Sequence, residues 1–248
     1  MENLKTLIYK MADSQMILGH RNSEWAGIAP ILEEDIAFAS MAQDKIGHAL
    51  ALYTILHENL GEQDPDTVAF SRKPTDWKNA VLCELYTKDY GFALVRHFLF
   101  DQLEAIRFNT LKNSSMEPLA QLAKKFSSEI KYHTMHGDIW IKNLATGNET
   151  AKAKVQTALN ECFEYANGLF EKVDNEEALI EQGLYVGEDV LKTAWLEKIT
   201  PVLASAGLHV PVFGDKGKGA LKGNHTLDLS ATLAEMTEVY DIEPGAEW

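Results

Sequence analysis

Four long segments of this chain carry apolar residues at helical spacing, and polar side chains interrupt each stripe near its middle. Spacings of three and four residues predict amphipathic helices whose apolar faces pack together. The four stripes are Leu4, Ile8, Met11, Gln15, Leu18; Phe38, Met41, Lys45, His48, Leu52; Leu94, Phe98, Asp101, Ala105, Phe108; and Phe126, Ile130, His133, Trp140. Polar groups in these stripes would point into a bundle core, where burial is costly unless they are satisfied. The pattern predicts an all-α bundle with a polar centre.

The polar positions repeat along the sequence. Lys45 follows Gln15 by 30 residues, and a histidine stands three residues further on. Ile130 follows Asp101 by 29 residues, again with a histidine three residues later. This is the layout of a ferritin-like di-iron bundle, in which one helix supplies Glu, the next supplies Glu-x-x-His, and the pair is repeated. We therefore predict a ferritin-like four-helix bundle core with additional C-terminal helices.

The helical patterns predict a single domain of all 248 residues, because no linker is flexible enough to separate domains. Two helical hairpins of the bundle are expected over about 3–59 and 89–143, and accessory helices over about 149–241. One of these, over about 188–206, is expected to be kinked or broken at Pro201.

Charge and composition exclude several classes of partner. The net charge of −14 argues against nucleic acid and against anionic membrane surfaces. The sequence contains no run of about 18 apolar residues, so it predicts no membrane-spanning helix. The charged N-terminal turns do not resemble a signal peptide, so we expect a cytoplasmic protein. Cys83 and Cys162 belong to no metal-binding motif and are expected to be free buried thiols.

The residues at the bundle centre are poor iron ligands. Lys45 would bring a positive charge to the place of a cation, Ile130 offers no donor atom, and Gln15 is neutral. In a core without metal, Lys45 would replace the metal charge and pair with Asp101. We interpret six positions as a vestigial di-iron site: Gln15, Lys45, His48, Asp101, Ile130 and His133.

A shifted ligand set is the alternative. Asp44 and His48 are four residues apart, as are Glu129 and His133, so each pair lies on roughly one helix face. With such ligands the chain would be a di-metal oxygenase or oxidase in its own right. A ferritin-like storage protein is a third possible class, but this chain lacks the ferroxidase ligands that such a protein needs. Further carboxylates stand nearby on the same helices: Glu33, Glu34 and Glu104.

Five other histidines show no partner at ligand spacing. A lone histidine in a helical protein is more often a surface group or a satisfied core group than a ligand. We therefore assign no metal-binding or catalytic role to His20, His57, His97, His136 or His209.

Several segments carry a resemblance to a known family. They are the Trp-x-Gly-x-Ala-Pro stretch and the acidic helix after it (24–49), the Ala-Phe-x-Arg connection (66–79), the Ala-Trp segment with its proline (194–211), Gly223-Asn224-His225, Leu233–Met236, and the terminal Pro244–Trp248. Together they resemble the C subunits of bacterial 1,2-phenylacetyl-CoA epoxidases, which are multicomponent ferritin-like monooxygenases. Glu33, Asp35 and Asp44 fall on positions that are acidic in that family. His48 departs from relatives that carry Gln.

The resemblance implies a role. In that family the catalytic A subunit holds the di-iron centre and binds phenylacetyl-CoA. The C subunit has a similar fold, lacks the full ligand set and supports A. We therefore expect a non-catalytic structural subunit with no cofactor of its own. Its expected partner is the catalytic A subunit, with the small B subunit and the reductase as further candidates.

A Gly/Lys-rich loop is the one basic patch in this acidic chain. It lacks the Gly-Lys-Ser/Thr sequence of a P-loop. Two interpretations remain open: a solvated flexible loop, or a contact to the partner subunit or to coenzyme A phosphates. The residues concerned are Lys216, Lys218 and Lys222.

Overall fold

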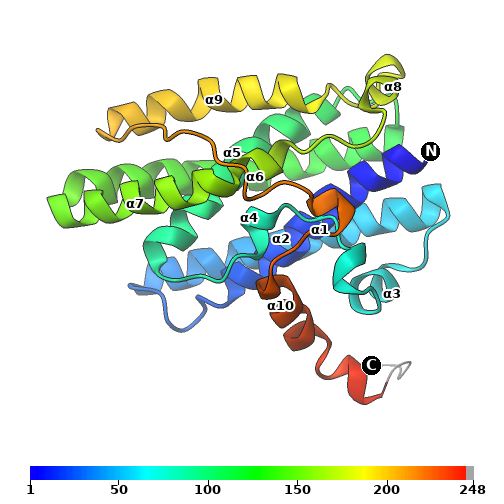
Figure 1. The fold of residues 1–248 in the computed structure, drawn as a ribbon, viewed down its shortest axis with the longest axis horizontal. Helices are drawn as coiled ribbons and strands as arrows, with labels where there is room; N and C mark the ends of the chain where they lie inside the picture. Colours follow the sequence, from blue (N-terminus) through cyan, green and yellow to red (C-terminus); the bar gives the residue numbers. More distant parts are fainter. Residues whose placement is uncertain (244–248) are drawn as a thin grey trace.

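The structure, a computed structural model, describes residues 1–243, and helices are its only regular elements within that range (Figure 1). The terminal segment 244–248, which contributes to the resemblance, lies outside the described residues. The elements are α1 (Glu2–Ser23), α2 (Leu32–Leu60), α3 (Pro65–Phe70), η1 (Pro74–Asp76), α4 (Val81–Glu84), α5 (Tyr90–Leu111), α6 (Glu117–Gly147), α7 (Glu149–Ala166), η2 (Asn167–Phe170), α8 (Glu176–Glu181), α9 (Glu188–Ser205), η3 (Ala220–Lys222), α10 (Leu227–Thr237) and η4 (Tyr240–Ile242).

Four of these helices form the bundle. α1 packs along α2, α5 packs along α6, and α2 and α6 lie side by side and join the two hairpins. The apolar stripes build the shared core, in which Met11, Leu52 and Phe98 are completely buried. The all-α bundle predicted from the stripes is thus confirmed.

The helix ends follow local capping signals. The side chain of Asp89 accepts a hydrogen bond from Phe92 N and begins α5, and Asn148 does the same for Ala151 N at the start of α7. α2 ends at Leu60 and is capped by Gly61, whose φ is 75°. Glycine adopts this left-handed conformation without steric cost. Such caps explain why the predicted helix ends lie within a few residues of the observed ones.

Of the kink or break expected at Pro201, the break is wrong, because α9 continues through this residue, and the kink stays a prediction. Proline removes one backbone donor, but neighbouring groups or water can satisfy the carbonyl it frees on an exposed helix face. Pro201 is exposed. The apolar side of α9 meanwhile stays packed on the bundle through Trp195, whose Nε1 donates to Leu99 O at 2.8 Å.

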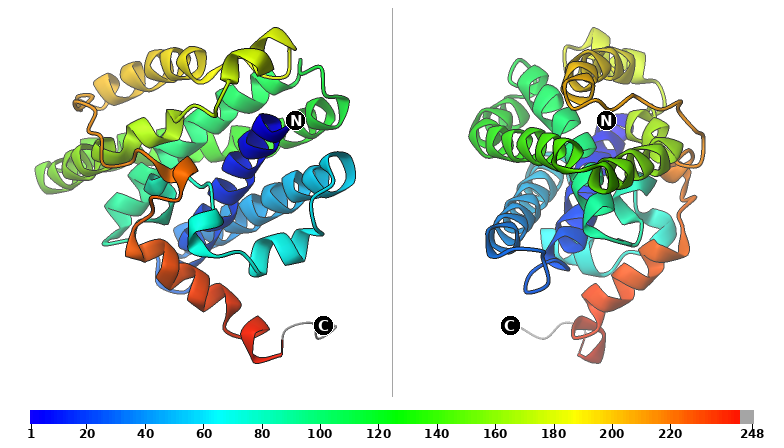
Figure 2. Two further views of the ribbon diagram at one scale, coloured as in Figure 1. Left: turned by 45° about the vertical axis from the view of Figure 1, so that its right-hand side comes forward. Right: turned by 90° about the vertical axis from the view of Figure 1, so that its left-hand side faces the viewer.

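The accessory helices are distributed unevenly around the bundle. α7 and α9 pack on α5 and α6, whereas α10 lies at the opposite end of the molecule beside α1, α3 and α4 (Figures 1 and 2). Among residues 1–243 no helix is long and apolar enough to cross a membrane. Cys83 and Cys162 are free and buried, as expected, and burial raises the pKa of both thiols to about 12.

Candidate functional site

An ion pair occupies the centre of the bundle. The Nζ atom of Lys45 on α2 donates to Oδ1 of Asp101 on α5. Both side chains are enclosed, with exposed fractions of 0% and 1%. The second oxygen, Oδ2, lies 2.7 Å from His97 Nδ1 and 3.9 Å from His133 Nδ1. The cluster therefore holds one ammonium, one carboxylate and two imidazoles.

The charge states follow from these contacts. Burial alone would raise the pKa of Asp101, but His97 and Lys45 outweigh it and hold this pKa well below its usual range. Burial lowers the pKa of His97 to about 4, although Asp101 opposes the shift. At neutral pH the cluster thus contains the carboxylate of Asp101 and a neutral His97. The ammonium of Lys45 is the compensating charge.

Two further bridges cross the seam between α2 and α6. His48 Nε2 lies 2.8 Å from Glu129 Oε2, and His133 Nε2 lies 3.0 Å from Asp44 Oδ2. Asp44 and His48 share one face of α2, and each bonds to a residue of α6. Burial lowers the pKa of His48 to about 4, so its neutral ring donates through Nε2 to the carboxylate. The bond from His133 lowers the pKa of Asp44.

Gln15 also forms a buried hydrogen bond. Its Nε2 donates to Glu104 Oε2 at 3.0 Å, and the other oxygen of Glu104 accepts from Arg107 Nη1. Burial raises the pKa of Glu104 even though Arg107 lowers it. Beyond Arg107 the network reaches Glu188 at 3.4 Å, and Glu188 accepts from Lys10 Nζ at 2.6 Å. A chain of buried charges therefore extends from the bundle centre toward α9.

The residues present do not fit a di-iron centre. Ile130 is 2% exposed and offers no donor atom. The amide of Gln15 is a weak ligand that is bonded to Glu104, and the ammonium of Lys45 lies where positive metal charge would be. Within residues 1–243 no group of three or more His, Cys, Asp or Glu side chains is placed to hold a metal ion. That the chain carries no cofactor stays a prediction.

Sequence reasoning missed two histidines of this core. His97 precedes Asp101 by one helical turn, a spacing that could have identified it. His136 Nε2 lies 3.0 Å from Glu34, and the hydroxyl of Tyr90 donates to the same carboxylate. The sequence places Glu34 and His136 102 residues apart, so no local signal indicates this contact.

A separate buried polar contact between Glu84 and His225, called the clasp below, fixes the segment before α10. Glu84 is 0% exposed and lies 2.8 Å from His225 Nδ1, while His225 Nε2 lies 2.9 Å from the carbonyl of Trp77. Both partners accept hydrogen bonds, so only the imidazolium satisfies them together. Burial opposes the charge, but the hydrogen bond to Glu84 outweighs it and raises the pKa of His225.

The clasp should loosen as pH rises. Because the pKa of His225 is raised above its unfolded value of 6.5, its stabilisation is complete below about pH 6.5 and is lost as pH rises through the folded pKa. We expect hydrogen exchange in 224–243 to increase from about pH 6 to pH 9 beyond the intrinsic base catalysis of exchange. In His225→Gln this extra increase should disappear. An equal increase in the variant would contradict a role for the imidazolium.

The Gly/Lys-rich loop lies close to α7 and η2. Its backbone bonds to Phe163 O and Glu164 O at 3.0 Å, and a Cβ on Gly217 would fall 2.2 Å from Tyr165 O. The lysines themselves are exposed. Lys216 lies 3.4 Å from Glu164, Lys218 lies 2.7 Å from Asp215, and no ion pair within residues 1–243 is found for Lys222. A contact to a partner or to coenzyme A stays a prediction.

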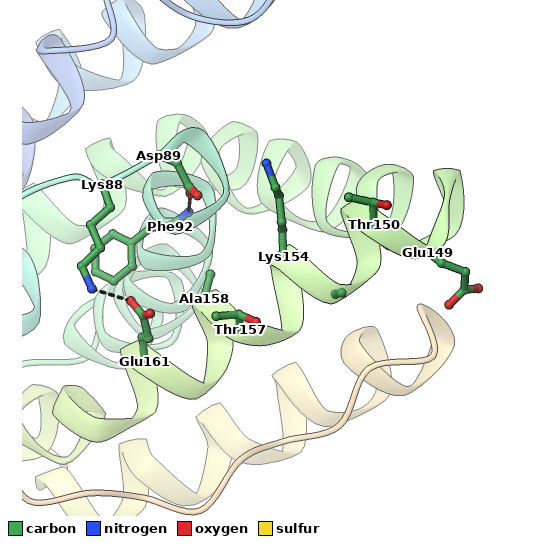
Figure 3. A pocket seen from close by; sticks show the side chains of 10 residues that line it. Lys88, Asp89, Phe92, Glu149, Thr150, Lys154, Thr157, Ala158 and Glu161 are labelled. Atoms are coloured by element: carbon green, nitrogen blue, oxygen red, sulfur yellow. Dashed lines mark hydrogen bonds and ion pairs between the residues drawn. The ribbon is translucent and has the colours of Figure 1, made fainter.

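A groove of about 490 Å³ runs between the start of α5 and α7 (Figure 3). Lys88 and Glu161 form an ion pair of 2.8 Å across one end, and Lys154 stands along its side (Figure 3). None of the site residues predicted from the sequence lines this groove.

The fold and its centre define a helical-bundle protein with a buried ion pair and a buried apolar side chain at positions where the sequence pattern predicts metal ligands. The whole chain, residues 1–248, matches the family described as phenylacetic acid catabolic protein, and the protein belongs to that family. It is 30% identical over 248 residues, all of both chains, to the C subunit of the 1,2-phenylacetyl-CoA epoxidase of Escherichia coli (strain K12). The family resemblance recognised in the sequence is thus confirmed.

Proposed function

We propose that this protein is a non-catalytic subunit of an epoxidase complex that acts on phenylacetyl-CoA. Its role is to hold the catalytic, di-iron A subunit in its active shape. The observation that carries the proposal is the buried ammonium of Lys45, which bonds Asp101 at the position where metal ligands are expected. The family and the similarity to a C subunit over its full length support membership of such a complex.

An exposed apolar surface on α2 and α6 supports a large partner interface. Leu32 and Ile36 on α2 are 69% and 62% exposed. On α6, Tyr132, Met135 and Ile139 follow each other at helical spacing and are 44%, 50% and 48% exposed. Apolar side chains that cluster on a surface mark interaction sites. A permanent subunit interface of this kind buries more than about 2,000 Å² in total.

Association with the A subunit tests the proposal. We expect the purified chain to form a stable heteromer with A. Its melting temperature should rise by about 2–4 °C for each kcal/mol by which binding stabilises the folded chain. Ile36→Glu with Met135→Glu should weaken the heteromer, whereas the matched control Val212→Glu, on the 89%-exposed loop residue, should not. A strictly monomeric chain that A neither binds nor stabilises would contradict the proposal.

The alternative is a di-metal oxygenase or oxidase that uses the shifted carboxylates. One observation favours it: two separate pairs of an imidazole and a carboxylate lie along the seam of α2 and α6, with the rings of His48 and His133 6.3 Å apart. Metal content separates the two functions, because this alternative requires bound metal and the subunit role does not.

A further inference from the structure

An open groove separates α10 from the connection between α1 and α2. It has a volume of about 920 Å³. In Figures 1 and 2, α10 leaves the body of the molecule beside this connection and projects from it. Its lining comes from three segments: the end of α1 with the turn after it, the segment before α5, and α10 with the residue that follows it.

Part of this groove is apolar and exposed. Ile28 is 69% exposed and Tyr86 is 62% exposed, although both are large apolar side chains. Ala231 and Ala234 face the groove from α10 and are also exposed. The exposed Leu32 at the start of α2 follows Ile28 by four residues in the sequence. The groove is therefore lined by exposed apolar side chains from both of its sides.

The side of the rim that α10 forms is acidic, whereas Lys88 on another side is already paired with Glu161. Ala231, Ala234 and Glu235 lie on one face of α10, and Glu238, the residue that follows the helix and keeps a helical conformation, extends this face at position i+7. Both glutamates are exposed, and neither forms an ion pair with any residue of 1–243. By contrast, the lining carboxylate of Glu24 is already paired with Arg21 at 2.6 Å.

The wall formed by α10 is anchored at its base. Thr226, the residue before α10, donates from its backbone N to Glu84 at 2.6 Å. Asp228 accepts from Tyr86 N at 2.7 Å through its carboxylate, and its carbonyl accepts from Arg21 at 3.2 Å. The groove is therefore held open by contacts that do not use Glu235 or Glu238, and a partner can bind without first ordering this helix.

We propose that this groove binds a helix of the partner subunit, with apolar side chains on its inner face and lysine or arginine at its edges. Alanines at 231 and 234 allow the close approach of a second helix, and helices bind such grooves through an apolar face. Basic residues opposite the two glutamates would give complementary charges across the contact. A second copy of this chain is a poor occupant, because its net charge is also −14. The inference rests on the proposed function, since it assigns the helix to the A subunit.

Charge reversal tests the groove. The variant Glu235→Lys/Glu238→Lys should bind the A subunit at least about tenfold more weakly than the unmodified chain, and the difference should shrink in 0.5 M salt. The matched control is Glu177→Lys/Glu181→Lys, two exposed glutamates on α8 with the same change in charge. The control should change the Kd less than about twofold. Ala234→Trp, which fills the groove without changing charge, should also weaken binding about tenfold.

Each outcome decides between the proposals. If the charge-reversed variant and its control bind A equally well, the groove is not the contact, and this inference is overturned alone. If the unmodified chain does not bind A, the proposed function fails and the inference fails with it. If Glu235→Lys/Glu238→Lys instead disrupts a dimer of this chain, the occupant is a second copy and the inference is overturned. Unchanged melting temperatures would show that the variants fold.

Discussion

Asp101→Leu should destabilise the protein by about 3–5 kcal/mol, because it leaves the ammonium of Lys45 buried without its carboxylate. Lys45 is 0% exposed, so solvent cannot replace the lost partner. His97 is neutral in the folded protein and offers no negative charge. Urea unfolding followed by circular dichroism measures the loss, with Leu99→Ala on the same helix as a control for a cavity without a charge.

Lys45→Met should lower the free energy of unfolding less than Asp101→Leu does, and the size of this loss should depend on pH. Without the ammonium, Asp101 can be compensated by a proton on His97, whose pKa Lys45 now lowers. The loss relative to the parent should therefore be smaller at about pH 5.5 than at pH 8. Asp101→Leu should show no such dependence, because the carboxylate that would stabilise a protonated His97 is gone.

Replacing both partners should recover much of the loss. Lys45→Met/Asp101→Leu leaves no uncompensated charge, and apolar groups of similar volume often replace a buried ion pair with little loss of stability. The double-mutant cycle should give a coupling energy well above the about 0.3–0.5 kcal/mol within which independent sites add. Strictly additive losses would contradict the assignment of Lys45 as the counter-charge of Asp101.

Restoring carboxylates should restore metal binding. We expect Gln15→Glu/Lys45→Glu/Ile130→Glu to take up about two iron ions per chain, because it rebuilds the Glu and Glu-x-x-His pattern with His48 and His133. The variant crowds carboxylates into an apolar core, so it should melt at a higher temperature with Fe(II) than without it. Iron content after anaerobic loading and the melting temperature are both measured.

The matched control for this variant is Lys45→Met/Ile130→Leu, which removes the ammonium and adds no ligand. It should take up no iron. Equal iron in the control would show that loss of charge, rather than the new carboxylates, opens the site. A folded triple variant without iron would show that the three positions do not form a lost metal site.

The repeat in the sequence placed Lys45 and Asp101 at matching positions of a di-iron layout, and the expected pairing of the two side chains follows from that layout rather than from local periodicity. It did not predict that His48 bonds Glu129 or that His133 bonds Asp44. Spacing shows which residues share a helix face, but it does not show which face of another helix lies opposite.

The network from Gln15 through Glu104 to Glu188 could not be predicted for the same reason. Its partners lie up to 178 residues apart, and they meet because α9 packs back on the bundle. The position of α10 depends on the clasp between Glu84 and His225, two residues separated by 141 positions. Long-range contacts of this kind leave no local pattern in a single sequence.

The most direct test of the central claim is the iron and manganese content of the unmodified chain after anaerobic loading with Fe(II) and desalting. We expect essentially no bound metal, because the ammonium of Lys45 occupies the centre and Ile130 supplies no ligand. About two ions per chain, the content of a di-iron protein, would contradict it. Asp44, His48 and His133 would then be the first residues to mutate.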